Sequence, residues 1–79
     1  MKVEVRLFAT LRAYVPGLGV GEAKIVELPP GATFTQLMET LGIAPAEVKI
    51  IMRNGRQVEP DDTIHDGDRI ALIPAVGGG

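Results

Sequence analysis

Three glycines close the chain, and their type and position suit a specific chemistry. Gly77, Gly78 and Gly79 follow an apolar segment and end in a carboxylate. Because glycine has no Cβ, such a tail is thin enough to enter a narrow tunnel, and an unperturbed terminal carboxylate is ionised at neutral pH. An ionised carboxylate can attack ATP to form an acyl-adenylate, from which a persulfide can displace AMP to leave a thiocarboxylate. The alternative is a frayed end or an expression scar.

Residues that could catalyse a reaction or bind a metal elsewhere in the chain are fewer. The sequence has no Cys, and His65 is its one imidazole, so it offers no thiolate and no nucleophile–base pair. His65 lies in an Asp-rich turn, where we expect a solvated side chain. Its acidic neighbours are better explained as turn formers than as metal ligands. They are Asp61, Asp62, Asp66 and Asp68. We therefore expect no metal site, no bound cofactor and no enzyme activity of the chain alone.

A second group of glycines, at Gly17, Gly19 and Gly21, could in principle cradle a phosphate. Phosphate-binding loops place their glycines between a strand and the N-terminus of a helix. Here a strand-like run follows, and neither a GxGxxG nor a GKS pattern is present. We interpret this segment as a mobile connection.

Length and charge limit the function classes. The chain has 79 residues, with eight Lys and Arg against ten Asp and Glu, for a formal net charge of -2. This length allows one domain, and the near-balanced charge argues against binding nucleic acid through its phosphates. No run approaches the roughly eighteen apolar residues of a membrane span, and no signal peptide opens the chain. We expect a soluble, cytoplasmic protein that binds neither nucleic acid nor membranes.

One main helix is expected, from Thr33 to the residue before Gly42. Thr33 is a residue type that caps helices, and Gln36 stands three positions later, which is the spacing of a capping box. Gly42 suits a left-handed C-cap. The apolar residues at helical spacing are Phe34, Leu37, Met38 and Leu41. A shorter helical turn, with Thr10 as its cap, is expected over residues 9–14.

Strands are expected before and after this helix. Residues 2–8 alternate between apolar and polar side chains, and Asn54-Gly55 is a strong hairpin signal. The other expected strands are 23–28, 48–52, 56–58 and 69–76. The order predicts an α+β fold, with one main helix packed on a mixed sheet of four to five strands. The first two strands would form a hairpin, and the last would lie parallel to the first.

Alternation also predicts a face for partner binding. The core side of the first strand carries Val3, Val5 and Leu7, so the opposite face of the sheet is left without a helix. The residues expected on that opposite face are Phe8, Ile51, Ala71 and Ile73. An apolar patch beside the tail would suit a protein interface. In the alternative, Phe8 and Ile73 pack beneath residues 9–14 or 16–22.

Several segments, taken in order, resemble one family. LFATLR at 7–12 is similar to an "FFA-x-LR" opening, and PPGAT at 29–33 to a turn into a helix. NG at 54–55 and DGDRI at 66–70 are similar to "NG" and "DGDEV" elements, and PAVGGG at 74–79 to a "PPV-x-GG" end. The chain thus resembles the MoaD/ThiS family of ubiquitin-like sulfur carriers along essentially its whole length.

This resemblance implies a β-grasp (ubiquitin-like) fold for residues 1–76, followed by a flexible glycine tail at 77–79. It implies that a MoeB- or ThiF-like activating enzyme uses ATP to adenylate Gly79, which then carries sulfur as a thiocarboxylate. For MoaD the acceptor partner is the large subunit of molybdopterin synthase, a MoaE-like protein. Gly78 and Gly79 match the functional tail. The residues expected to bind partners are Phe8, Ile73, Pro74, Val76 and Gly77.

Two departures bear on the branch of the family. Ala75 stands where MoaD usually has a second proline, and alanine stiffens the chain less than proline does. Gly77 replaces the usual Ala or Ser, which gives an end also seen in ThiS-like carriers. The length and the FATLR segment favour a carrier for molybdopterin synthesis. The alternatives are a ThiS-like carrier for thiazole synthesis, a ubiquitin-like protein modifier joined to lysines through Gly79, and a plain binding module with an incidental tail.

Overall fold

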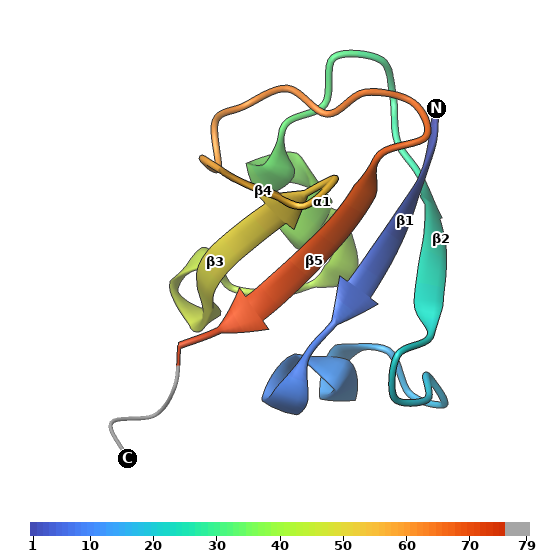
Figure 1. Cartoon of the computed structure of the whole chain (residues 1–79), viewed down its shortest axis with the longest axis vertical. Helices are drawn as coiled ribbons and strands as arrows, with labels where there is room; N and C mark the ends of the chain where they lie inside the picture. Colours follow the sequence, from blue (N-terminus) through green and yellow to red (C-terminus); the bar gives the residue numbers. More distant parts are fainter. Residues whose placement is uncertain (76–79) are drawn as a thin grey trace.

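The computed structural model describes residues 1–75, which form a five-stranded sheet with one α-helix behind it (Figure 1). The strands are β1 (Lys2–Leu7), β2 (Ala23–Glu27), β3 (Val48–Arg53), β4 (Arg56–Val58) and β5 (Arg69–Pro74). Their order is β2-β1-β5-β3-β4, with β1 and β5 parallel and the other neighbours antiparallel. The predicted α+β class, the opening hairpin and the parallel pairing of the last strand with the first are confirmed.

The helix α1 (Phe34–Leu41) begins and ends where the sequence predicts. The Thr33 hydroxyl accepts the backbone N–H of Gln36 at 3.3 Å, and the Gln36 side chain accepts the backbone N–H of Thr33 at 2.8 Å. Gly42 is left-handed, with a φ of 75°. These contacts satisfy backbone groups that a helix leaves free at its ends.

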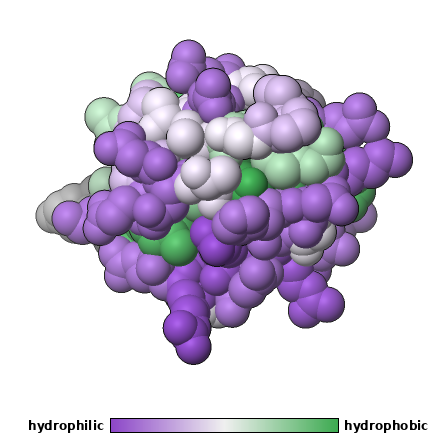
Figure 2. Space-filling view, turned by 90° about the horizontal axis from the view of Figure 1, so that it is seen from above, coloured by the Kyte–Doolittle hydropathy of each residue, from purple (hydrophilic) through white to green (hydrophobic). Residues whose placement is uncertain are grey.

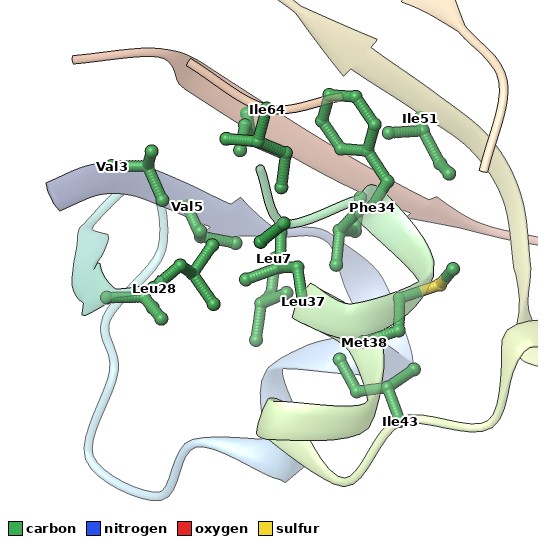
Figure 3. Packing of buried hydrophobic residues seen from close by; sticks show 14 of the residues in the cluster. Val3, Val5, Leu7, Leu28, Phe34, Leu37, Met38, Ile43, Ile51 and Ile64 are labelled. Carbon is green, nitrogen blue, oxygen red and sulfur yellow. The ribbon is translucent and has the colours of Figure 1, made fainter. Parts of the chain in front are cut away.

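The core lies between α1 and the inner face of the sheet. The helix buries Phe34, Leu37 and Met38, and Figure 3 shows these side chains meeting those of the sheet and loops in one cluster. The buried residues of the strands are Val3, Val5, Leu7, Val26, Ile51, Ile70 and Leu72. Their removal from water is the main source of stability for so small a domain. The helix covers only this face, so no helix of residues 1–75 lies over the opposite face of the sheet.

Two short 3₁₀ helices lie where β5 ends. They are η1 (Ala9–Tyr14), which follows β1, and η2 (Pro45–Glu47), which precedes β3. The prediction that Thr10 caps the first of them is wrong, because Phe8 is the N-cap residue and makes no side-chain cap hydrogen bond. Instead, η1 is held by burying Leu11 in the core.

The other end of the sheet is closed by a polar network around Asp68, which is only 5% exposed. Its carboxylate accepts the backbone N–H of His65 at 2.8 Å and the side-chain amide of Asn54 at 3.2 Å, and pairs with Arg53 at 3.5 Å. The prediction that these aspartates form turns is confirmed for Asp68. His65 itself is exposed, as expected.

Two findings concern residues 1–75 only. No helix in this part of the chain is long and apolar enough to cross a membrane. No group of three or more His, Cys, Asp or Glu side chains within it is placed to hold a metal ion. The expected boundary between residues 1–76 and the 77–79 tail lies outside the described residues and stays a prediction.

Candidate functional site

The uncovered face of the sheet is apolar where β5 approaches its end. On β5, Ile70 and Leu72 are buried against the helix side, so Ala71 and Ile73 point to the opposite face. The β3–β5 register pairs Ile50 with Ile73 and Met52 with Ala71, which puts Ile50 and Met52 on the same face. All four side chains are partly exposed.

Phe8 extends this apolar surface across to the end of β1. Its backbone is extended, its N–H donates to the carbonyl of Leu72 at 3.2 Å, and its side chain is 44% exposed. The parallel register pairs Leu7 with Leu72, so one further step places Phe8 beside Ile73. We call the resulting surface the outer patch; it consists of Phe8, Ile50, Met52, Ala71 and Ile73. The sequence placed Phe8, Ala71 and Ile73 on this face correctly.

Ile51 is the residue that the sequence placed on the wrong face. It is 4% exposed, pairs with Leu72 and belongs to the core. The run Val48–Met52 is apolar apart from one lysine, so alternation gives no sign of which side is buried. Counting back from the Asn54-Gly55 turn would have given the answer, because Ile51 lies opposite Val58, which packs on the core. The same count would have revealed Ile50 and Met52.

The root of the tail is anchored next to the outer patch. β5 ends at Pro74, and the β3–β5 register shifts between Val48 and Ile50, opposite this proline. Proline has no N–H to give to the ladder, which explains an irregularity at this point. Pairing resumes at Ala75, whose N–H donates to the carbonyl of Glu47 at 3.2 Å.

A recess of about 500 Å³ opens beside this root, between η1, η2 and the end of β5. Across it, the Tyr14 hydroxyl donates a hydrogen bond to the Glu47 carboxylate. This hydrogen bond, partial burial and the negative charge of Glu47, in that order, raise the pKa of Tyr14 above its ordinary value. Nothing in the sequence signals the contact, since its partners stand 33 positions apart.

Charged side chains on the same sheet face lie on β1 and β2, and Arg6 stands directly beside Ala71 in the parallel register. Arg6 pairs with Glu4 at 3.7 Å and Lys2 with Glu27 at 3.9 Å, all with exposed or partly exposed side chains. Such pairs contribute little stability. The outer patch therefore borders charged side chains of β1 at Arg6 and adjoins Pro74 and Ala75 at the end of β5.

The residues expected to carry the chemistry are not among those that the structure describes. Val76, Gly77, Gly78 and Gly79 lie outside residues 1–75. Of the expected partner-binding residues, Phe8, Ile73 and Pro74 are described, and all three are at least partly exposed at the tail end of the sheet. Their role in binding, and the role of Gly79, stay predictions.

The model of the ThiS family matches residues 5–79, which is nearly the whole chain. The chain belongs to the ThiS family. The resemblance to the MoaD/ThiS family, inferred from the motifs, is confirmed. No curated protein matches this ThiS family chain.

Solved structures agree with this membership and with the β-grasp fold. A putative molybdopterin converting factor, subunit 1, from Pyrococcus furiosus is 29% identical, with a TM-score of 0.73, covering 96% of this chain and 99% of that one. A chain of the protein–protein complex of subunits 1 and 2 of molybdopterin-converting factor from Helicobacter pylori is also similar. It is 25% identical with a TM-score of 0.63, and both chains are fully covered. A ubiquitin from Caldiarchaeum subterraneum, 22% identical with a TM-score of 0.61, covers 100% of this chain and 98% of that one and supports the ubiquitin-like fold.

Proposed function

We propose that this ThiS family chain is a sulfur carrier that delivers sulfur from a thiocarboxylate on Gly79 in the synthesis of molybdopterin. The observation that carries the proposal is the family match, which continues through the last glycine at residue 79. The similarity to a putative subunit 1 of molybdopterin converting factor favours this pathway. The chain is then a substrate of partner enzymes and not an enzyme alone. We place this role in the cytoplasm, where ATP is available to the activating partner.

The chemistry requires three balanced steps at the Gly79 carboxyl. In the first, a carboxylate oxygen attacks the α-phosphorus of ATP and pyrophosphate leaves, giving an acyl-adenylate. In the second, the terminal sulfur of a persulfide attacks the carbonyl carbon and AMP leaves, giving an acyl disulfide. In the third, a thiol cleaves the S–S bond by exchange, which frees the thiocarboxylate and forms a new disulfide. ATP and the persulfide belong to a MoeB- or ThiF-like activating enzyme.

The outer patch gives such an enzyme a place to dock. Phe8, Ile50 and Ile73 form an apolar surface next to the tail root, and aromatic and aliphatic side chains in such positions often dominate binding energy. A protein bound there would hold its reactive centre close to the residues that follow Ala75. A MoaE-like large subunit is the second partner that we propose, since the Helicobacter pylori relative is described as a complex of subunits 1 and 2.

Deleting Gly79 tests the proposal. ATP–pyrophosphate exchange catalysed by an activating enzyme of this family should be lost, because the tail no longer reaches the adenylation centre. The melting temperature should be unchanged, because β5 ends at Pro74, before the deleted residue in the sequence. Thr35→Val is the control, since it leaves the tail unchanged and removes only the Thr35 hydroxyl bond to Pro60. If the deleted chain is still adenylated, the assignment to Gly79 is wrong.

A carrier for thiazole synthesis is the second candidate. The observation that favours it is Gly77, which gives the VGGG end that resembles ThiS-like carriers. The two roles share every step up to the thiocarboxylate and differ only in the acceptor. Incubating the thiocarboxylated chain with a MoaE-like subunit and the molybdopterin precursor distinguishes them, because only the molybdopterin carrier should lose its sulfur.

A further inference from the structure

The strands on either side of β5 each carry a short helix at the point where β5 ends. η1 follows β1 and η2 precedes β3, and β5 lies between β1 and β3 in the sheet. The hydrogen bond from Tyr14 to Glu47 joins these two helices beside the root of the tail. Figure 1 shows η1, the coil that follows β1, at the same end of the sheet as the tip of β5.

Glu47 connects this bond to Ala75, at the root of the tail. Its carboxylate accepts the Tyr14 hydroxyl, while its carbonyl accepts the N–H of Ala75. Glu47 thus holds η1 through its side chain and the tail root through its backbone. The Ala75 bond exists only because residue 75 keeps an N–H that proline would lack.

We propose that Tyr14 and Glu47 form a clasp that holds Ala75 and so fixes the direction in which the tail leaves the sheet. This inference rests on the proposed carrier function. Both act as positioning residues in this proposal, because the reacting group is the carboxyl of Gly79 and not either of these side chains. When the root is held, the tail can adopt fewer orientations. Less conformational entropy is then lost when the tail enters the partner's active centre.

The raised pKa of Tyr14 agrees with this geometry. The hydrogen bond to Glu47 is the largest cause of this shift, because it favours the protonated, donating form of the phenol. The ring is partly buried against the core, which limits its rotation. We therefore expect the clasp to form at neutral pH, with Glu47 bonded to Tyr14 through its side chain and to Ala75 through its backbone.

Steady-state kinetics of ATP–pyrophosphate exchange distinguishes an effect on tail placement, through the clasp, from an effect on docking, through the outer patch. Tyr14→Phe and Glu47→Ala should each lower kcat about threefold to tenfold with KM unchanged, since docking is intact and only tail placement suffers. The double variant should lose no more than either single one, because both break the same bond. Glu47→Gln keeps an oxygen that can accept the phenol and should recover most of the rate. Thr35→Val is the control; it removes the Thr35 hydroxyl bond to Pro60 at the opposite end of the sheet.

Amide hydrogen exchange of Ala75 gives a readout that does not depend on any partner. Exchange should be at least about tenfold faster in Tyr14→Phe and Glu47→Ala than in the wild type or Thr35→Val. Unchanged exchange at Ala75 would overturn the clasp as an anchor. Faster exchange with unchanged kcat would overturn its role in positioning. A wild-type chain that is not adenylated at all would instead overturn the proposed carrier function, and the Ala75 result would still report on the anchor.

Discussion

The two ends of the sheet are held in different ways. At one end, Asp68 is buried and joins the β3–β4 hairpin to the loop before β5 through three partners. At the other, an apolar patch and a recess surround the tail root, and the hydrogen bond from Tyr14 to Glu47 joins η1 to η2. Figure 2, which looks onto the Asp68 end, shows a mainly hydrophilic surface. The contrast indicates that the Asp68 end secures the fold, and it fits our proposal that the other end presents the tail.

The largest expected effect is a loss of stability when the Asp68 carboxylate is removed. Asp68→Ala should lower the free energy of unfolding by about 3 kcal/mol, because it removes a buried carboxylate from its hydrogen-bond donors. Urea denaturation measures the change. Asp66→Ala is the matched control, since that exposed carboxylate accepts only the N–H of Lys2 at 2.8 Å. An equal cost for both variants would show that burial of Asp68 does not matter, and the contrast between the ends would fail.

The second largest expected effect concerns partner binding at the tail end of the sheet. Ile73→Asp should weaken binding of the activating enzyme at least about tenfold, because a charge must then be desolvated in the interface, while costing about 1 kcal/mol of stability or less. Isothermal titration gives the Kd. Ile25→Asp is the control, because Ile25 is 55% exposed on the same face but lies on the edge strand β2. Equal losses from the two variants would show that the partner does not distinguish the outer patch from the rest of the face.

The smallest effect concerns pH and the clasp. Because Glu47 raises the pKa of Tyr14 in the folded chain, the clasp stabilises the protein fully below the unfolded pKa of about 10. That contribution is lost as the pH rises through the higher, folded value. The stability difference between wild type and Tyr14→Phe should therefore shrink in alkali.

Absorbance of the phenolate follows the same titration directly, since Tyr14 is the one tyrosine of the chain. Its midpoint should fall toward the ordinary value in Glu47→Ala. A midpoint that does not move in this variant would mean that Glu47 is not the hydrogen-bond partner in solution.

Most of the fold could be predicted because its signals are local. The capping box at Thr33 and Gln36, the left-handed Gly42 and the Asn54-Gly55 turn each depend on residues within a few positions of one another. Strand alternation in residues 2–8 identified the buried face in the same way. These patterns fixed the order of elements, and the order was enough to predict the mixed sheet.

The parts of the site that were missed depend on contacts between distant segments. The apolar run around Ile51 is compatible with either face until the hairpin register is known. The bond between Tyr14 and Glu47 joins two segments that only the folded sheet brings together. The role of the terminal glycines came from residue type and family motifs, which is why it needs a chemical test.

The central claim is that Gly79 carries sulfur, and the intact mass of the chain tests it most directly. The wild-type protein is incubated with ATP, an activating enzyme of the family, a persulfide donor and a thiol that cleaves the acyl disulfide. The mass should rise by the difference between one sulfur and one oxygen atom, and fragmentation should localise the change to Gly79. An unchanged mass, or conjugates joined to lysines in its place, would contradict the account.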